Sequence, residues 1–325
     1  MSFSFNMPRY AALLWFFGLG MAVAVIVWSG YGDILRALGH AGWKILIVAP
    51  YRFIPMLCCA FAWRALIVDE KRPSIGLVSY FLWIRSAVDN LMPAAHIGGE
   101  IAALRVMAKY GFGKAAALAS MIVEVTLALV TLILFGVVSI AFFAWQAERH
   151  EATAHLLLGL SFSFLVVALL FYIQRQGLFR ILSRISRAIF GSDAWLKLAG
   201  DGRRFDQAVD RLYGDKRNIF VCSAWELLAW VVGSGETWLA LYILGHPVSM
   251  LQATLVEALV QVSINMFFMM PAALGVQETG FVLAGYIAGV PPDIAAALAV
   301  IRRCGDLLAY VPGLVAWQIE ESIRS

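Results

Sequence analysis

Long apolar runs recur along the chain, and several are long enough to cross a membrane. A spanning helix needs about 20 apolar residues, and six runs approach or exceed that length. The predicted spans are Ala11–Trp28, Trp43–Trp63, Ala115–Trp145, His155–Ile173, Ile219–Leu244 and Ile294–Ile319. The first is expected to be an uncleaved span, because it is longer than the apolar core of a signal peptide. Continuous rather than alternating apolar residues exclude a membrane β-barrel, so we predict an all-α integral membrane protein.

Two further apolar stretches are interrupted by charges, prolines and glycines, and neither fits a simple span. The first, Ile75–Lys109, contains Arg85, Asp89, Pro93, Gly98, Gly99, Glu100 and Arg105. The second, Met250–Gly289, contains Glu257, Pro271, Gly275, Glu278 and Gly280. Irregular backbone at membrane depth is tolerated inside protein or beside a water-filled cavity. Both stretches are therefore predicted to be re-entrant or broken-helix hairpins.

Lysine and arginine gather in one segment, which sets the predicted orientation. Residues 174–218 hold ten of the 25 basic residues, and cytoplasmic loops carry such an excess. The loops expected on the opposite side hold only Arg36, Lys44 and Arg149. We therefore predict six crossings with both termini in the cytoplasm. In this arrangement the first hairpin opens to the cytoplasm and the second to the outside.

The basic segment 174–218 includes an amphipathic stretch, LFRILSRISRAIF, at residues 178–190. On a helix its leucines and isoleucines share one face, and Arg180, Arg184 and Arg187 lie opposite. Such a helix is suited to lie on anionic lipid headgroups. A cytoplasmic helix packed on the protein would have the same pattern, so the sequence leaves both interpretations open.

The two hairpins carry matching motifs. MPAAHIGGE at Met92–Glu100 corresponds to MPAALGVQE at Met270–Glu278, at a constant offset of 178 residues. Three predicted spans separate the copies, and an odd number of crossings inverts the second copy. We therefore predict one polytopic domain, 1–325, built from inverted-topology halves at 1–150 and 175–325. In transporters, Pro/Gly-interrupted segments at matching positions indicate the substrate site, although prolines also kink ordinary spans.

The predicted turns themselves consist of a small group of helix-breaking residues. They are Pro93, Gly98 and Gly99 in the first hairpin, and Pro271 and Gly275 in the second. Both turns are expected to face a shared central cavity, because non-helical backbone at this depth needs such surroundings.

Composition agrees with a membrane protein. Hydrophobic residues make up 62% of the chain and charged residues 14%, against roughly 25% charged in soluble proteins. This excludes a cytosolic enzyme, a nucleic-acid-binding protein and a disordered chain. The cysteines Cys58, Cys59, Cys222 and Cys304 lie in apolar runs without metal-binding spacing. We expect all four to be buried, reduced packing residues, and we expect neither a metal nor a cofactor.

Several charged residues fall inside the predicted spans, where each costs at least about 2.5–3.5 kcal/mol at the helix centre. Glu124 and Arg302 lie near the expected midplane, and Arg303 and Asp306 follow Arg302. Glu124 and Arg302 occupy matching positions in the two halves. We therefore predict that Glu124, Arg302 and Arg303 form one buried group that lines a substrate path.

Other charges are weaker candidates for the same path. Glu100 and Glu278 follow the two hairpin turns, where a carboxylate in the first turn of a helix is also stabilised by the helix dipole. The sequence therefore leaves helix capping and a functional role open for both. Arg52, Arg105 and Glu236 complete the candidate set.

The candidate residues suit a lipid headgroup of either kind. Arginine binds phosphate through its planar fork, and carboxylates accept hydrogen bonds from a polyol. Enzyme signals are few, because the chain has no aspartate-rich DDxxD motif, no Walker A motif and no GxSxG motif. Two alternatives to transport are an integral-membrane enzyme that modifies a polyprenyl or hopanoid lipid, and a scaffold for lipid-synthesis enzymes.

The hairpin sequences resemble a known family. The motifs RSAVDNLMPAAHIGGEIAALRVMAKYG and MMPAALGVQETGFVLAGYIAGVPPDIAAALAVIRRCGDLLAYVPGLVAWQ are similar to the flippase-like membrane domain of lysylphosphatidylglycerol synthases, closest to the stand-alone hopanoid-associated HpnL-like branch. The resemblance implies a protein of the bacterial inner membrane that moves or hands over a hopanoid or an anionic phospholipid toward the outer membrane. It also implies lipid-synthesis or lipid-export partners. The aminoacylating domain of those synthases has no counterpart in the sequence.

Overall fold

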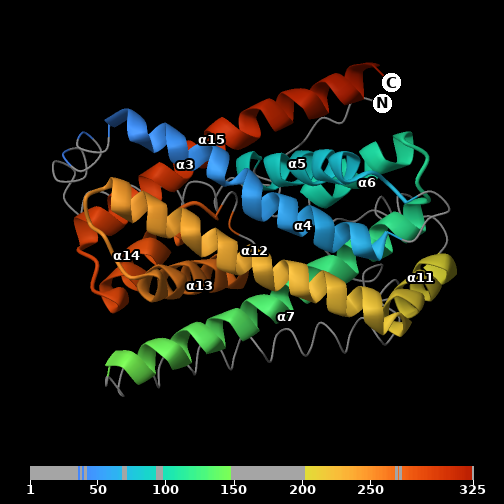
Figure 1. Cartoon of the computed structure of the whole chain (residues 1–325). Coiled ribbons are helices and arrows are strands. Elements are labelled where there is room, and N and C mark those ends of the chain that lie inside the picture. Colours follow the sequence, from blue (N-terminus) through green and yellow to red (C-terminus); the bar gives the residue numbers. More distant parts are fainter. Residues whose placement is uncertain are drawn as a thin grey trace. The chain divides into compact units, whose positions relative to one another are not determined.

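The computed structural model of the chain describes residues 36, 39, 42–67, 72–92, 98–147, 202–267, 270 and 273–323. In these residues the regular structure is helical, as predicted, without a strand (Figure 1). The helices are η1 (Gly42–Lys44), α3 (Ile45–Tyr51), α4 (Phe53–Leu66), α5 (Ile75–Leu91), α6 (Gly98–Lys109), α7 (Lys114–Ala147), α11 (Gly202–Gly214), α12 (Lys216–Ile243), α13 (Met250–Met266), α14 (Val276–Ala288) and α15 (Pro292–Ile323).

Three stretches of helix are long and apolar enough to cross a membrane. They are Gly42–Leu66, Lys114–Phe143 and Lys216–Ile243, and they coincide with three of the predicted spans. The predicted spans Ala11–Trp28 and His155–Ile173, and the amphipathic stretch 178–190, lie outside the described residues. The predicted span Ile294–Ile319 falls within α15, which carries Arg302, Arg303 and Asp306 along its length.

The described residues divide into two compact units. Unit 1 comprises residues up to Arg52, Ser86–Gly99 and Ser234–Val315, and unit 2 comprises Phe53–Arg85, Glu100–Gly233 and residues from Ala316 onward. Each unit therefore draws on both predicted halves of the sequence. The largest fully buried side chains are Phe281 and Leu241 in unit 1, and Trp63, Phe81 and Phe205 in unit 2. Each unit has its own apolar core.

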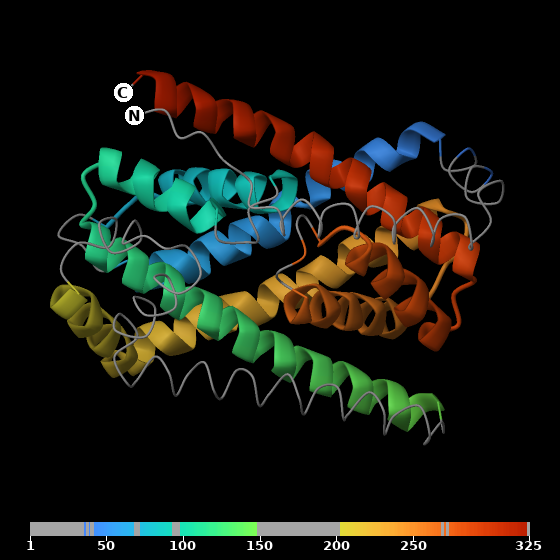
Figure 2. The same ribbon diagram turned by 180° about the vertical axis from the view of Figure 1, so that it is seen from behind.

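Both interrupted stretches form pairs of short helices rather than single spans. α5 and α6 form the first pair, and α13 and α14, which pack side by side in unit 1, form the second (Figure 2). The boundaries follow the sequence repeat closely. α6 and α14 begin 178 residues apart, at Gly98 and Val276, and α7 and α15 begin 178 residues apart, at Lys114 and Pro292.

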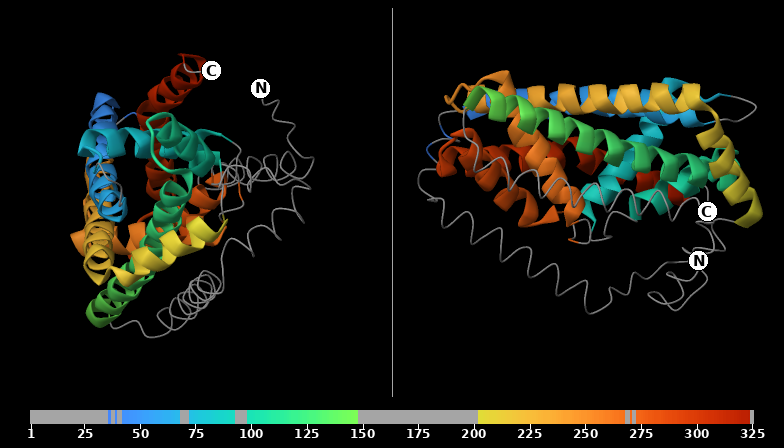
Figure 3. Two further views of the ribbon diagram at one scale, coloured as in Figure 1. Left: turned by 90° about the vertical axis from the view of Figure 1, so that its right-hand side faces the viewer. Right: turned by 90° about the horizontal axis from the view of Figure 1, so that it is seen from below.

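The outer face of α7 shows the apolar exposure that lipid contact requires. Val130, Leu134, Val138 and Phe142 are all exposed, and their four-residue spacing places them on one side of the helix. At its other end, α7 packs against α11 within unit 2 (Figure 3). α11 is amphipathic and buries Phe205, the largest side chain of its apolar face.

The four cysteines are free thiols. Cys58 and Cys222 are buried as predicted, whereas Cys59 is only half-buried, and the expectation is wrong for Cys304, which is exposed. Cys304 lies one turn before the exposed Leu307 and Leu308. It therefore belongs to the outward apolar face of α15, so an apolar sequence context did not imply burial inside the protein.

Candidate functional site

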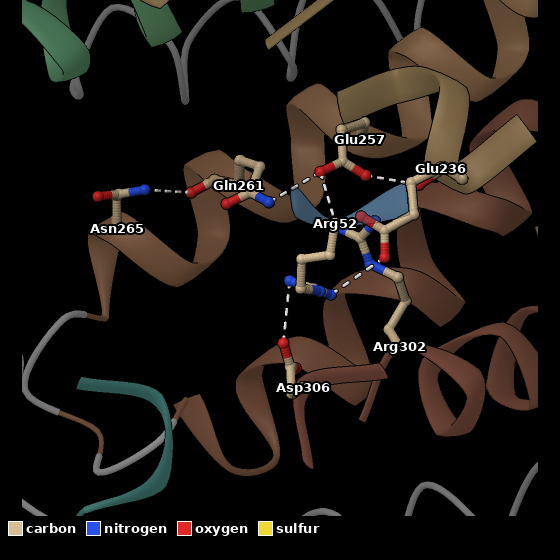
Figure 4. A network of polar contacts seen from close by, with 8 residues as sticks. Arg52, Glu236, Glu257, Gln261, Asn265, Arg302 and Asp306 are labelled. Atoms are coloured by element: carbon tan, nitrogen blue, oxygen red, sulfur yellow. Dashed lines mark hydrogen bonds and ion pairs between the residues drawn. The ribbon is translucent and has the colours of Figure 1, made fainter. Parts of the chain in front are cut away.

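Unit 1 holds a buried network of five charges in which the signs alternate (Figure 4). Asp306 Oδ1 lies 2.9 Å from Arg52 Nη1, and Arg52 Nη2 lies 3.3 Å from Glu236 Oε1. Glu236 Oε2 then lies 2.8 Å from Arg302 Nη1, and Arg302 Nη2 donates to Glu257 Oε1 at 3.0 Å. Four of the five residues are at most 4% exposed, and the Arg52 side chain is 15% exposed. Each charge therefore has an opposite charge beside it inside the protein.

A break between α3 and α4 places Arg52 in this network. Proline at position 55 has no N–H to donate to the carbonyl of Tyr51, and its ring crowds that carbonyl. The helix is interrupted at Arg52 as a result. Gly235 supports the arrangement, because a Cβ atom there would overlap the hydroxyl of Tyr51. Nearby prolines and glycines therefore help to set the positions of Arg52 and Glu236 in the network.

Neutral side chains complete the network at Glu257. Thr237 Oγ1 donates to Glu257 Oε2 at 2.5 Å, and Gln261 Nε2 donates to Glu257 Oε1 at 2.8 Å. Asn265 continues the chain by donating to the backbone carbonyl of Gln261 (Figure 4). Polar residues one turn apart on α13 therefore extend from the buried charges toward the end of that helix.

Arg303 binds the segment that leads into α14. Its Nε donates to Glu278 Oε1 at 2.8 Å, and its Nη2 donates to the carbonyl of Ala273 at 3.0 Å. Glu278 Oε2 in turn accepts from the N–H of Gly275 at 2.8 Å. Ala273 has a positive φ of 49°, which is strained for a residue with a Cβ. Glu278 is thus both a helix cap and an arginine partner, and the clamp holds the strained backbone in place.

Unit 2 contains a second buried charge cluster, centred on Arg85 of α5. Arg85 Nη1 donates to Glu124 Oε2 at 2.7 Å, and Arg85 Nη2 lies 2.8 Å from Glu100 Oε1. The guanidinium also lies 5.7 Å from the ring centroid of Trp63, whose indole donates to Ser120 at 3.1 Å. One arginine therefore bridges a carboxylate of α6 and a carboxylate of α7.

Glu226 of α12 is the third acid of this cluster. The residue is 1% exposed, and its Oε2 lies 3.7 Å from the thiol of Cys59. The negative charge of Glu124 also acts on its carboxyl. We name Arg85, Glu100, Glu124 and Glu226 the acid cluster.

The three residues that sequence symmetry placed together each have a different partner. Glu124 pairs with Arg85, Arg302 pairs with Glu236 and Glu257, and Arg303 pairs with Glu278. The predicted pairing of Glu124 with the two arginines is therefore wrong. Matching depth in a repeat does not fix which way a side chain points around its helix axis.

Other candidate residues have different locations. Arg105 lies outside both clusters, with its Nη1 3.9 Å from Glu321 Oε1 and 30% of its side chain exposed. Gly98 and Gly99 begin α6, where the Gly99 N–H donates to Asp89 at 2.9 Å. Gly275 is the N-cap residue of α14 and has a φ of 76°. Pro93 and Pro271 lie outside the described residues.

Three members of the clusters were not among the candidates from the sequence. They are Arg85, Glu226 and Glu257, and each interrupts an apolar run. Glu226 had the clearest signal, because it lies ten residues into its helix, as Glu124 does. In the part of the chain that the structure describes, no group of three or more His, Cys, Asp or Glu residues could hold a metal ion.

Comparison with known proteins gave one match. A family model described as the lysylphosphatidylglycerol synthase TM region matches residues 15–313, and so covers most of the chain. Searches of the curated proteins and of the solved structures found no match.

Proposed function

The chain belongs to the lysylphosphatidylglycerol synthase TM-region family, and from this membership we propose that it is a lipid flippase or lipid-transfer protein of the bacterial inner membrane. Its cargo in this proposal is a hopanoid or an anionic phospholipid that moves toward the outer membrane. The family supports a lipid-related membrane role, and the apolar spans support a polytopic arrangement. The direction and the cargo are the parts that experiment must test.

The five-charge network of unit 1 is the observation that carries the proposal. Five ionisable residues in membrane-embedded helices are costly, and buried ion pairs are often no more stabilising than apolar side chains of similar volume. Stability alone therefore gives little reason to keep them. A polar headgroup that crosses the hydrocarbon core needs donors and acceptors of this kind, whereas the acyl or hopane body needs only apolar surface.

Two hydrogen-bond donors of the network are left without a partner among the described residues. The Nε atoms of Arg52 and Arg302 are buried and have no hydrogen-bond partner among the residues that the structure describes. An N–H left unsatisfied in a buried site costs free energy. A phosphate or hydroxyl oxygen of a lipid headgroup would satisfy such donors, and arginine binds phosphate more specifically than lysine does.

The sequence repeat supports transport rather than catalysis. Helices α6 and α7 follow the first Pro-Ala-Ala motif, and α14 and α15 follow the second with starts offset by 178 residues. Such matching segments are expected around a transporter's substrate site. We propose that the two halves are inverted. A reporter fused after Arg187 should then report the cytoplasm and one fused at Arg149 the outside, and the same side for both would contradict the inverted arrangement.

Lipid movement in vesicles tests the proposal. The purified full chain is reconstituted into liposomes that contain a fluorescent phosphatidylglycerol analogue or a fluorescent hopanoid, and an impermeant reductant reports transfer between leaflets. Arg302→Lys keeps the charge but loses the planar fork, so this variant should fold and move lipid more slowly. Arg217→Lys, the same change at an exposed position on α12, is the matched control.

Two results would overturn the assignment. The first is transfer no faster than in protein-free vesicles for either lipid, which would remove the flippase role. The second is unchanged transfer by folded Arg302→Lys and Arg302→Gln variants, which would show that the network does not touch the headgroup.

A further inference from the structure

The acid cluster of unit 2 has more negative than positive groups. Glu100, Glu124 and Glu226 face one arginine, Arg85, which lies within 2.8 Å of Glu100 and Glu124. Glu226 has no ion pair with any described residue. In unit 1, by contrast, each of the three acids of the network has a carboxylate oxygen within 3.3 Å of an arginine nitrogen. Of the two clusters, and counting only described residues, the acid cluster alone contains a carboxyl group without an ion pair.

Glu226 is buried and incompletely satisfied. The residue is 1% exposed, and its Oε1 has no hydrogen-bond partner among the described residues. The negative charge of Glu124 also acts on its carboxyl. Two neighbouring carboxylates repel each other when both are ionised, and this repulsion is relieved when one of them carries a proton. A lone carboxylate in so apolar a site is also strongly disfavoured relative to its neutral form.

In the part of the chain that the structure describes, no other group near Glu226 would neutralise it. The titratable and charged groups that act on it are Glu124, Arg85 and Cys59, with Cys58 and Cys222 as further thiols. Arg85 is occupied by Glu124 and Glu100. The thiols are weak donors, so the contact with Cys59 does not replace a counter-ion. A bound proton fits these contacts without any further group.

The position of the pair along the spans suits a proton that moves. Glu124 and Glu226 each lie ten residues after the first residue of their helices, at Lys114 and Lys216. At about 1.5 Å per residue this is roughly 15 Å, half of the ~30 Å hydrocarbon core. Ionisable residues at this depth often form proton relays in pumps and transporters.

We propose that Glu124 and Glu226 form a proton-binding site and that the uptake and release of this proton drive lipid movement. The second part rests on the proposed function. In the resting state Glu226 holds the proton and Glu124 holds Arg85. Transfer of the proton to Glu124 neutralises the partner of Arg85, weakens that ion pair and leaves the charge on Glu226. Release of this proton from Glu124 to one side of the membrane and uptake of another by Glu226 from the other side restore the starting charges, and no oxidation or reduction is involved.

Infrared spectroscopy tests the site independently of lipid movement. The reconstituted full chain at neutral pH should show a carbonyl band of a protonated carboxylic acid that shifts in D₂O. Glu226→Gln should remove this band. Glu257→Gln is the matched control, because Glu257 is equally buried but is held by Arg302, and this variant should keep the band. A wild-type protein without the band would overturn the proton site.

Lipid asymmetry under a pH gradient tests the coupling. One proton per lipid would sustain about a tenfold difference in lipid distribution per pH unit, since one unit corresponds to 1.36 kcal/mol. The wild-type protein should build this asymmetry, and a Na⁺ gradient should not. Glu226→Gln should move lipid without building asymmetry, whereas Glu226→Asp, which keeps a carboxyl, should retain part of it.

The possible failures are distinguishable. If the wild-type protein moves lipid at a rate and to an asymmetry that do not depend on pH, the coupling is overturned but the flippase role remains. A Na⁺-dependent asymmetry would replace the proton by a metal cation. Absence of lipid movement with the infrared band present would overturn the proposed function and the coupling but leave the proton site. If Glu226→Gln does not fold, the wild-type band and the Glu226→Asp asymmetry still decide between these outcomes.

Discussion

The charge balance of the unit 1 network predicts which single charge removal costs the protein more stability. The network has three acids and two arginines, and Arg302 touches two of the acids, at 2.8 and 3.0 Å. Arg302→Gln leaves three acids and one arginine, and Glu257 then has no arginine partner in the network. Glu257→Gln leaves two acids and two arginines, and its amide still accepts hydrogen bonds. The arginine variant should therefore be much the less stable of the two.

The expected magnitudes are well separated. Breaking a buried ion pair by removing one partner costs about 3–5 kcal/mol, which lowers the folding equilibrium constant of Arg302→Gln by about two to three and a half orders of magnitude. Glu257→Gln should cost about 1–2 kcal/mol, typical of a weakened buried hydrogen bond. In the double variant the two losses overlap, so its cost should be smaller than their sum by about 1–3 kcal/mol.

Equilibrium unfolding of the purified variants in mixed micelles measures these differences, with the wild type and Arg217→Lys as references. A double-variant cost below the sum of the single costs requires energetic coupling between Arg302 and Glu257. If the double variant loses the plain sum of the two single losses, within about 0.5 kcal/mol, the residues are energetically independent. Equal losses for the two single variants would likewise refute the argument from charge balance.

Two further predictions concern packing and the α14 clamp. Gly285→Ala places a Cβ atom 2.8 Å from the Cβ of Ala295, so it should destabilise the protein by about 1–3 kcal/mol, whereas Gly76→Ala, which meets nothing within 4 Å, should not lower the unfolding midpoint. Arg303→Lys cannot reach both the Glu278 carboxylate and the nearby backbone carbonyl, so hydrogen exchange at the start of α14 should accelerate while exchange in α7 stays unchanged; unchanged exchange at both would show that the clamp is not needed.

Much of the local structure could be predicted because it depends on neighbours in the sequence. One local feature was missed: the predicted span Trp43–Trp63 is interrupted at Arg52, although the proline at position 55 explains the break. The positions of Glu100 and Glu278 after glycine predicted first-turn acids, and both residues lie in first turns. The 178-residue offset between motifs reappears as the offset between helix starts. These features depend on backbone chemistry over a few residues.

Partner choice could not be predicted in the same way. Glu226 and Arg85 lie 141 residues apart in the sequence, and nothing near either residue indicates the other. Whether two midspan charges meet depends on the rotation of each helix about its axis, which is set by the packing of apolar side chains such as Trp63 and Phe81. Depth can be counted along a helix, whereas rotation is decided by the fold.

The matched helices carry their ion pairs with exchanged signs, which explains the failed pairing. In the first half, α7 supplies an acid, Glu124, to an arginine of α5. In the second half, α15 supplies an arginine, Arg302, at the matching position, and α13 supplies the acid, Glu257. Opposite charges at matching positions looked like partners across the repeat, yet each is satisfied by the hairpin of its own half. A repeated backbone thus fixes where a charge is tolerated, while its sign follows from the neighbouring helix.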